Sequence, residues 1–445
     1  MRYKKHIDFL APIYISSFFD SRKSASNKEP EISLYGKIKR KLVQALNLFR
    51  ALTYFKNIKT SYDSLAFVSD RSRRLIDGKY VSGAVDRLIV SSRCLVVETR
   101  QINKVKPRDA YSDSVISDSY INLLAYLYKV FFLRRLNYSN DFIDDKLNSN
   151  PELKEAFSEK TILKIMKNHY SKFVISRWIL KIFKVKSVYI TCPYGRFWLI
   201  QACNSLNIKV IEIQHGQFSE VHEGYFPKIK YDFSRSIVDT ILVYSPYYAK
   251  MLEKSIAYNQ VEKIPVGNFF IEHYQSKENK VHRCENSFCV SLQNICDEEL
   301  ISIILPFFIE NPQFNCFLFP RGRDKGFFDK LSVPRNVYFM WGGNIYEKLI
   351  ECRYHITMNS TCAYEASALG CYNIVVDPNI SSFFTKRVEI MANNLDKSDE
   401  HFLLINSTDC FKEKLHGFIK NNHATTSEYW YMKMYSNNIK GLSFK

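Results

Sequence analysis

Short apolar runs alternate with segments of helical periodicity over most of the chain, and this alternation constrains the fold more than any other feature. In the middle of the chain, strands are expected at residues 187–191, 209–213, 240–245 and 263–267, and helices at residues 196–206 and 247–255. Parallel strands need crossover connections, which helices of this length supply. The sequence therefore predicts a parallel α/β sheet in this part of the chain.

The alternation restarts after a polar, charged stretch at residues 274–287, which we interpret as a domain boundary. Strands are then expected at residues 288–292, 314–319, 337–340, 355–358 and 373–376, and helices at residues 297–310, 345–352 and 362–369. A chain of 445 residues is also long for a single hydrophobic core. We therefore predict an α/β protein with two Rossmann-like domains that face each other across a cleft.

The first part of the chain is expected to add further elements. Residues 36–55 have helical periodicity with a basic face, and such a helix either packs on its own domain or lies on an anionic membrane. Strands are expected at residues 65–69 and 94–98, a helix at 81–88, and helices through 112–183. The predicted organisation is a basic helical segment at 1–60, an N-terminal Rossmann-like domain at 61–280, and a C-terminal one at 281–445 that ends in helices.

The strand at residues 209–213 stops abruptly at a cluster of polar side chains. This cluster consists of Glu212, Gln214, His215, Glu220 and His222. Polar groups at the carboxyl end of a strand lie where open α/β sheets bind ligands. Gly216 and Gly224 are expected to adopt backbone angles that other residues avoid. We interpret the stretch as one side of an active site, with His215 best placed for proton transfer or for holding a charged ligand.

A metal site is not expected. The seven-residue separation of His215 and His222 matches no familiar ligand spacing, and the sequence contains no Asp-x-Asp pair. The eleven cysteines include no Cys-x-x-Cys pair, and their odd number without a framework indicates a reducing compartment. We expect neither a metal ion nor an organic cofactor.

The second half contains a strand end that is followed at once by a helix, at Met358-Asn-Ser-Thr361. Ser360 or Thr361 can cap that helix, whose free N–H groups form a ready phosphate site. Glu365 follows one helical turn later, where it could face a ribose hydroxyl. The competing interpretation is an ordinary N-cap, which α/β proteins contain in large numbers.

Two further loops are candidates for ligand binding, and each is equally well explained as a solvated turn. Arg321 and Arg323 follow a predicted strand and could clamp a phosphate or carboxylate, because guanidinium groups bind such anions through two hydrogen bonds. Asp77 precedes a glycine and is flanked by basic residues after another strand.

The net charge of +18 indicates attraction to polyanions: nucleic acid, anionic lipid or phosphorylated substrates. Solubilising surface charge explains it as well. The longest apolar stretch after the N-terminus, residues 120–132, is too short to span a bilayer, and Arg134 and Arg135 follow it. With no signal peptide expected, we predict a cytoplasmic protein.

Two motifs resemble the GT-B glycosyltransferases that build bacterial surface polysaccharides. Gln214-His215-Gly216 is followed by His222-Glu-Gly-Tyr225-Phe-Pro227, as in capsule and O-antigen transferases, and the second half carries Asn-Ser-Thr…Tyr-Glu-Ala…Leu-Gly. The resemblance implies a nucleotide-sugar donor in the C-terminal domain and a lipid-linked glycan acceptor in the N-terminal domain. It also implies metal-independent transfer by an enzyme that is peripheral on the inner face of the cytoplasmic membrane.

The resemblance distributes the candidate residues over three roles. His215 is the candidate base or ligand anchor, with Glu212 and Glu220 as alternatives. Arg321, Arg323, Ser360, Thr361 and Glu365 would bind the donor, and Gln214, Gly216, His222, Tyr225 and Asp77 would line the acceptor side or the cleft. The chain departs from related Kdo and sialic acid transferases, which carry His-Pro at Phe319-Pro320, so a CMP-linked donor is in doubt.

Three other functions fit parts of the sequence. A polyol-phosphate transferase of the teichoic-acid type shares the His-Gly and the two-domain plan, and would use CDP-glycerol or CDP-ribitol. A nucleotide-sugar epimerase has the same architecture and needs no acceptor. A basic nucleic-acid-binding protein is suggested only by charge and aromatic content, without a recognised motif, so we expect no nucleic-acid partner.

Overall fold

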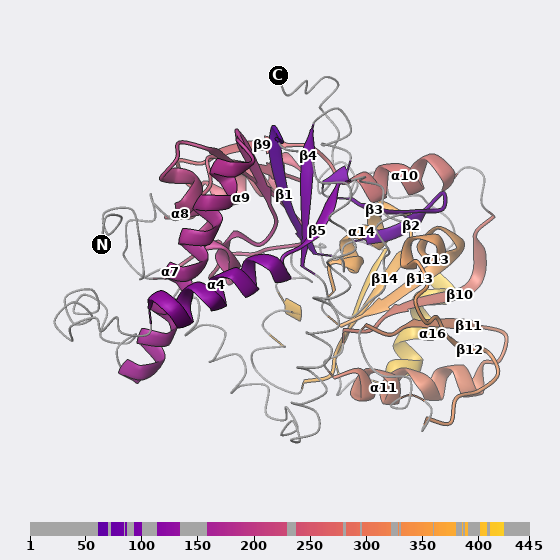
Figure 1. Ribbon diagram of the computed structural model, residues 1–445. Helices are drawn as coiled ribbons and strands as arrows, with labels where there is room; N and C mark the ends of the chain where they lie inside the picture. The colour runs from indigo at the N-terminus through magenta and orange to yellow at the C-terminus, as the bar shows by residue number, and fades with distance from the viewer. Residues whose placement is uncertain are drawn as a thin grey trace. The chain divides into compact units, whose positions relative to one another are not determined.

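The computed structural model describes residues 61–69, 73–83, 85–86, 93–99, 114–133, 158–228, 237–278, 282–293, 296–321, 328, 331–358, 360–379, 385, 388–389, 401–406 and 410–421. The chain divides into two compact units (Figure 1). The N-terminal unit extends to Val243 and includes Ala249–Ile264, and the C-terminal unit comprises Tyr244–Tyr248 and the chain from Pro265. The helix expected at 36–55 lies outside the described residues, and so does the chain beyond residue 421, where the predicted C-terminal helices would continue.

The N-terminal unit is built on a sheet that has seven strands in the described residues. They are β1 (Ser64–Ser69), β4 (Cys94–Thr99), β5 (Val115–Ser117), β6 (Ser187–Ile190), β7 (Lys209–Ile213), β8 (Thr240–Val243) and β9 (Glu262–Pro265). The order across the sheet is β5-β4-β1-β6-β7-β8-β9, and β1 pairs in parallel with both β4 and β6. Numbered along the chain, the first six strands have the Rossmann order 3-2-1-4-5-6.

The C-terminal unit repeats this order in its own sheet. Its strands are β10 (Cys284–Ser291), β11 (Asn315–Phe319), β12 (Val337–Phe339), β13 (Cys352–Thr357), β14 (Tyr372–Asp377) and β15 (Phe402–Asn406). They are arranged β12-β11-β10-β13-β14-β15, and each neighbouring pair is parallel. This is again the order 3-2-1-4-5-6, so the predicted class, an α/β protein with two Rossmann-like domains, is confirmed.

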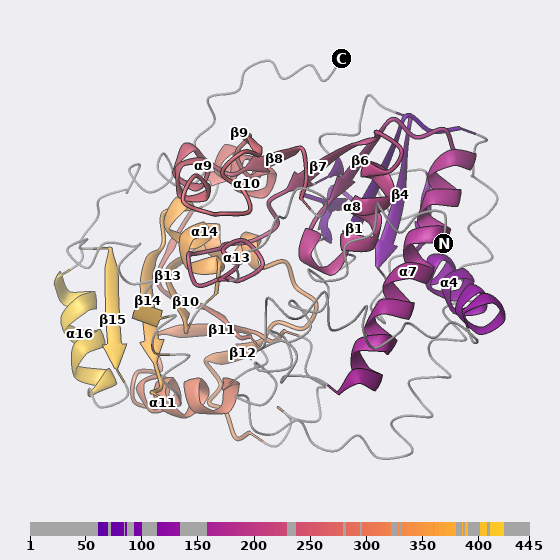
Figure 2. The same ribbon diagram turned by 90° about the vertical axis from the view of Figure 1, so that its left-hand side faces the viewer.

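Helices cover both sheets (Figures 1 and 2). The N-terminal unit has α4 (Ser119–Phe132), α7 (Glu159–Ile182), the short 3₁₀ helix η5 (Pro193–Gly195) and α8 (Phe197–Asn204); α9 (Pro246–Leu252) contributes residues to both units. The C-terminal unit has α10 (Phe269–Glu278), α11 (Asp297–Glu310), α13 (Ile345–Glu351), α14 (Cys362–Ala368) and α16 (Phe411–Asn421). Helix α7 begins after Ser158, whose hydroxyl accepts the N–H of Thr161 at 3.4 Å.

Each unit has its own buried core. In the N-terminal unit, a buried hydrogen bond of 3.0 Å between His169 Nε2 and Gln201 Oε1 joins α7 to α8. In the C-terminal unit, the Phe288 ring lies 5.2 Å from that of Phe308 and 4.7 Å from that of Tyr354, which fastens α11 to the sheet. Aromatic pairs of this kind add to the free energy gained from burial.

A two-stranded hairpin follows β1, where a loop and a helix at residues 81–88 were expected. Strands β2 (Arg73–Ile76) and β3 (Lys79–Ser82) pair antiparallel, so the predicted helix does not begin at residue 81. Asp86 is helical, and residues 87–92 lie outside the described part of the chain. The turn residues Asp77 and Gly78 have φ of 48° and 78°, and a two-residue turn of type I′ needs positive φ at both positions. Asp77 is exposed at the tip of this hairpin.

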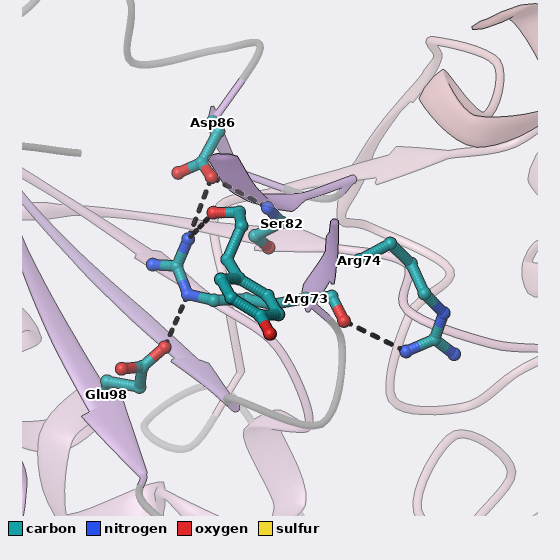
Figure 3. A network of polar contacts seen from close by, with 6 residues as sticks. Arg73, Arg74, Ser82, Asp86 and Glu98 are labelled. Atoms are coloured by element: carbon teal, nitrogen blue, oxygen red, sulfur yellow. Dashed lines mark hydrogen bonds and ion pairs between the residues drawn. The ribbon is translucent and has the colours of Figure 1, made fainter. Parts of the chain in front are cut away.

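A buried ion network fastens the hairpin to the main sheet (Figure 3). Arg73 donates from Nε to Glu98 Oε1 at 2.5 Å and from Nη1 to Asp86 Oδ2 at 3.0 Å and the Tyr80 carbonyl at 2.9 Å. Asp86 also accepts the N–H of Ser82 at 2.7 Å. Because Glu98 belongs to β4, the network holds the hairpin against the carboxyl end of that strand.

Besides the hairpin strands β2 and β3, two short strands were not predicted from the sequence. Strand β5 lies within residues 112–183, where the helical prediction is wrong at Val115–Ser117. Three residues are too few to show a period, and pairing with β4 decides their conformation. Strand β15, which pairs with β14 at the edge of its sheet, was not predicted.

Candidate functional site

In each sheet the strand order reverses at one place, and ligands of open α/β proteins bind beyond the carboxyl ends of the strands there. In the N-terminal unit the reversal lies between β1 and β6. The loops that follow β6 and β7 begin at Thr191 and Gln214, and β6 and β7 are neighbours in register, with Ile190 opposite Glu212. The two loops therefore leave the sheet side by side.

A thiol and an imidazole meet between these loops. Cys192 Sγ lies 2.9 Å from His215 Nε2 and 3.7 Å from Nδ1. Cys192 has a left-handed backbone with φ 54° and ψ 66°, a conformation that costs a residue other than glycine about 1–3 kcal/mol. Strain of this size is retained where the surrounding structure demands it, which makes the pair a candidate for function.

The surroundings keep both groups neutral near pH 7. Although His215 retains an exposed surface, the dense packing around it lowers the pKa of its imidazole by desolvation. The Glu212 carboxylate opposes this shift and Arg196 reinforces it. Desolvation raises the pKa of the Cys192 thiol, against the opposing effects of a hydrogen bond with Tyr194 and of Arg196.

Arg196 places a cation at the same edge of the sheet. It donates from Nη1 to the Thr191 carbonyl and from Nη2 to Thr99 Oγ1 at 3.2 Å, so it bridges the ends of β4 and β6. The Asp118 carboxyl interacts electrostatically with both Arg196 and Lys172. Desolvation raises the pKa of Asp118, and the positive charges of Arg196 and Lys172 oppose this rise. A guanidinium beside the reversal point is suited to an anionic ligand.

Glu212 points into the core rather than toward a ligand. Its side chain is fully buried, and its two carboxylate oxygens accept hydrogen bonds of 2.7 Å from the hydroxyls of Tyr225 and Tyr258. Desolvation raises its pKa to about 7, although both tyrosine hydroxyls and His215 lower it. With both oxygens engaged, Glu212 holds the loop in place, and its contact with Tyr225 fixes the far end of that loop.

The loop after β7 folds back through short-range hydrogen bonds. The N–H groups of Tyr225 and Phe226 donate to the His222 carbonyl at 2.8 Å, and Ser255 Oγ donates to the Tyr225 carbonyl at 2.5 Å. The His222 ring lies 5.3 Å from that of Tyr194, and its Nδ1 accepts the Gly224 N–H at 3.2 Å. His222 is therefore part of the packing that shapes the loop.

The glycine prediction for this loop needs correction. Neither Gly216 nor Gly224 has a positive φ, so neither is required for an unusual backbone angle. A Cβ on Gly224 would instead lie 2.7 Å from Tyr194 Cδ1 and 3.0 Å from His222 Cε1. Glycine is needed at 224 because two rings pack directly on the backbone.

Two remaining residues of the predicted cluster are held by partners other than the imidazole. Gln214 is buried, donates its N–H to the Leu242 carbonyl at 2.9 Å, and bonds the Gly216 carbonyl through Nε2 at 3.0 Å. Glu220 is exposed and forms an ion pair of 2.7 Å with Lys254. His215 is thus an accessible titratable group directly after β7, whereas the exposed Glu220 further along the loop is paired with Lys254.

In the C-terminal unit the reversal lies between β10 and β13, and the Ser360–Thr361 turn follows β13. Ser360 Oγ accepts the N–H of Cys362 at 3.2 Å, whereas Thr361 makes no side-chain capping bond. Helix α14, with seven residues, starts directly after this turn. The longer α11 carries Asp297, Glu298 and Glu299 in its first turn, which disfavours an anion there.

Glu365 is buried in the first turn of α14 and accepts a hydrogen bond of 2.9 Å from the Tyr346 hydroxyl. Tyr346 in turn stacks on Tyr274 with ring centroids 5.6 Å apart. Burial, with a further contribution from Glu365, raises the pKa of Tyr244, which belongs to the same unit. The carboxylate is thus held by aromatic side chains behind the turn.

A chain of buried, hydrogen-bonded polar side chains links neighbouring strands of the C-terminal sheet. His355 bonds Ser291 Oγ through Nε2 at 3.1 Å and Asn373 Oδ1 through Nδ1 at 2.8 Å, and Asn373 Nδ2 donates to the Ala363 carbonyl at 2.9 Å. Desolvation lowers the pKa of His355 to about 4, so the imidazole is neutral. The chain connects β10, β13 and β14 to α14 and gives the turn a rigid support.

Of the two arginines predicted to bind phosphate, one belongs to the described residues. Arg321 is exposed immediately after β11, and Arg323 lies outside the described residues. Sequence reasoning overlooked Cys192, Tyr194, Arg196 and Tyr258. One signal was available, because Arg196 begins a helix directly after a strand and a turn, the position at which α/β proteins bind anions.

No family model matches the chain, and no curated protein matches it. Similar solved structures include UDP-GlcNAc 2-epimerase from Methanocaldococcus jannaschii with UDP-GlcNAc and UDP (15% identity, 84% of this chain and 96% of that chain, TM-score 0.46). The UDP-GlcNAc 2-epimerase from Neisseria meningitidis has 13% identity over 84% of this chain and 94% of that chain, with a TM-score of 0.45. The calicheamicin glycosyltransferase CalG4 has 12% identity over 81% and 89%, with a TM-score of 0.45. These values are too low to establish a common fold, so the class rests on the strand order alone.

Two searches of the described residues bear on other kinds of site. No cluster of three or more His, Cys, Asp or Glu side chains among them could hold a metal ion. None of their helices is both long and apolar enough to cross a bilayer.

Proposed function

We propose that the protein is a glycosyltransferase that moves a sugar from a nucleotide-sugar donor to a growing lipid-linked surface polysaccharide without a catalytic metal. The observation that carries the proposal is the accessible, neutral imidazole of His215 at the carboxyl edge of a Rossmann-type sheet. A second Rossmann-type unit in the same chain offers a serine-capped turn at its own reversal point. The Gln-His-Gly motif suggests capsule or O-antigen synthesis, in the cytoplasm at the membrane surface.

His215 would act as the general base for the acceptor hydroxyl. A base must present an unprotonated nitrogen, and the shorter of the two contacts with Cys192 Sγ engages Nε2. In the tautomer with the proton on Nε2, that N–H donates to the sulfur and Nδ1 keeps its lone pair for the acceptor proton. Cys192 would act as a positioning residue that holds the imidazole, because its neutral thiol can accept from Nε2–H in this tautomer or donate to Nε2 in the other.

The donor would be held by the C-terminal unit. The N–H groups at the start of α14 and the Ser360–Thr361 turn would bind the diphosphate, and the exposed Arg321 would add charge as the phosphate departs. Glu365, supported by Tyr346, would bond a ribose hydroxyl. We propose the same role for Arg323, on the basis of its position in the sequence.

The experiment is a transfer assay in which membrane extracts supply lipid-linked acceptors and UDP-, GDP-, CMP- and CDP-linked donors are tested in turn. His215→Ala should lower kcat about 100-fold or more, because general-base catalysis contributes roughly that factor. His282→Ala is the matched control, since that histidine is exposed in the C-terminal unit and belongs to no site described above. Wild-type turnover by His215→Ala would refute the base assignment.

The same assay separates the competing functions. Use of CDP-glycerol or CDP-ribitol, but of no sugar donor, would establish a polyol-phosphate transferase. Conversion of a nucleotide sugar without any acceptor would establish an epimerase. Salt-dependent binding of random oligonucleotides that survives His215→Ala and Glu365→Gln would favour a nucleic-acid-binding protein.

A further inference from the structure

Helix α4 exposes an apolar surface that is unusual for a helix at the edge of a protein. Its sequence, SYINLLAYLYKVFF, is apolar on nearly every side, yet only Ile121 and Ala125 are buried in the described structure. Five large side chains are exposed instead: Tyr126 (57%), Leu127 (39%), Val130 (37%), Phe131 (74%) and Phe132 (68%). We call these five residues the α4 apolar face.

The helical period places most of this face on the side of α4 that is turned away from its own unit. Tyr126, Leu127, Val130 and Phe131 follow the i, i+1, i+4, i+5 pattern of a single face. The opposite side packs on α7, where Lys129 Nζ donates to Asn168 Oδ1 at 2.7 Å and the Tyr128 ring lies 6.4 Å from that of Tyr170. Figures 1 and 2 show α4 lying against α7 in both views.

The charge around this face indicates what covers it. Helices α4 and α7 together contain seven lysine or arginine residues and a single acidic residue, Glu159. Lys160, Lys164 and Lys181 are exposed on α7, and Arg134 and Arg135 follow α4 in the sequence. Apolar side chains beside excess positive charge match a bilayer surface that contains anionic lipid.

The size of the face argues against a protein partner. One side of a helix with the length of α4 covers on the order of 200 Å², whereas a stable interface buries roughly 800 Å² on each partner. A helix of 14 residues is about 21 Å long and too short to cross a hydrocarbon core of about 30 Å. It can lie in the plane of the interface with its apolar side in the lipid.

We propose that the α4 apolar face inserts into the surface of an anionic bilayer and that the exposed lysines of α7 bind the lipid headgroups. Lys129 lies 5.5 Å from the centre of the Tyr126 ring, so its amine is at the border between the apolar side chains and the polar surface. The proposal does not rest on glycosyl transfer, because binding to lipid needs neither donor nor acceptor.

The test uses the full-length protein and sedimentation with vesicles of phosphatidylcholine, with or without phosphatidylglycerol. Binding should require the anionic lipid and weaken with salt. Phe131→Ser should lower the partition coefficient about ten-fold, because one large apolar side chain no longer enters the lipid. Ile309→Ser is the matched control, since Ile309 is an equally apolar side chain, 57% exposed on α11 of the other unit.

A second pair of variants reports contact directly. Phe131→Trp should shift its fluorescence to the blue on anionic vesicles and be quenched by brominated lipid, whereas Ile309→Trp should show neither effect. Circular dichroism of each variant confirms that the fold is retained.

Equal vesicle binding by wild type and Phe131→Ser, or an unshifted spectrum for Phe131→Trp, would overturn the proposal. Equal binding to neutral and anionic vesicles would overturn the role of the basic residues. A wild-type dimer that Phe131→Ser converts to a monomer would show instead that a second copy of the chain covers the face.

Discussion

Replacing Glu212 with glutamine tests how this carboxyl group is held in the core. Glu212 is fully buried and accepts from the hydroxyls of Tyr225 and Tyr258 at 2.7 Å each. Its pKa is about 7 in the folded protein and 4.5 in the absence of these surroundings. Glutamine has nearly the same shape but no charge, so it removes the ionisation and leaves the packing.

The sign of the pH dependence follows from the raised pKa. Between pH 4.5 and 7 the folded protein binds the Glu212 proton and the unfolded chain releases it. The stabilisation is complete below the unfolded pKa and is lost as the pH rises through the folded value. A difference of this size corresponds to about 3 kcal/mol in the free energy of unfolding.

The measurement is urea unfolding of wild type and Glu212→Gln at pH 5 and pH 8.5, with the difference between the two proteins compared at each pH. Subtraction cancels the titration of the groups that are not coupled to Glu212. We expect the stability of Glu212→Gln relative to wild type to increase by about 2–3 kcal/mol from pH 5 to pH 8.5, because part of the total change has already occurred at pH 5. A relative stability that is constant over this range would refute the assignment of a raised pKa to Glu212.

Three further substitutions have outcomes fixed by the local structure. Gly224→Ala should destabilise the protein by about 1–3 kcal/mol in urea unfolding, because its Cβ would lie 2.7 Å from Tyr194 Cδ1, whereas Gly195→Ala, with open space around it, should change little. Arg73→Ala should cost about 3–5 kcal/mol in the same assay by leaving two buried carboxylates without their partner; a loss below about 1 kcal/mol would contradict the network. Glu220→Gln should leave the unfolding midpoint nearly unchanged, because its ion pair is exposed and worth at most about 1 kcal/mol, and it should retain transfer activity. Loss of transfer in that variant would return Glu220 to the candidate bases.

The class of fold could be predicted because its signal is local. Helix α11 begins and ends at the residues predicted from periodicity, residues 297–310, and β7 occupies the predicted 209–213. A helix of this length shows the helical period in its sequence, and a buried strand of a parallel sheet shows a continuous apolar run. Strand β5, with three residues, is not, and only its pairing with β4 defines it.

The site could be predicted only in part because its geometry depends on contacts between distant segments. The approach of Cys192 to His215 follows from the register of β6 on β7, which periodicity does not specify. The burial of Glu212 could have been foreseen, since it stands inside a strand that is apolar on both sides, as strands covered on both faces are. The different positions of the two residues therefore explain their different environments. Glu212 lies inside the strand and anchors the loop from the core, whereas His215 follows the strand and stays accessible.

Glu212 and His215 are electrostatically coupled, and the order in which they bind protons decides what each can do. The Glu212 carboxylate raises the pKa of His215, while burial lowers it below the ordinary 6.5. Because burial raises the pKa of Glu212 to about 7 and lowers that of His215, we expect Glu212 to take up its proton first as the pH falls, so that its charge is gone before the imidazole titrates.

Removal of that charge should therefore leave the titration of His215 where it is. We expect Glu212→Gln to shift the His215 midpoint, followed by NMR of the ring with His215→Asn to assign the signal, by less than about 0.3 pH units. A fall of about one unit would mean that the carboxylate is still ionised when the imidazole titrates, and the order of protonation would be reversed. In that case the pair would share its proton at neutral pH, and His215 would no longer be a neutral base there.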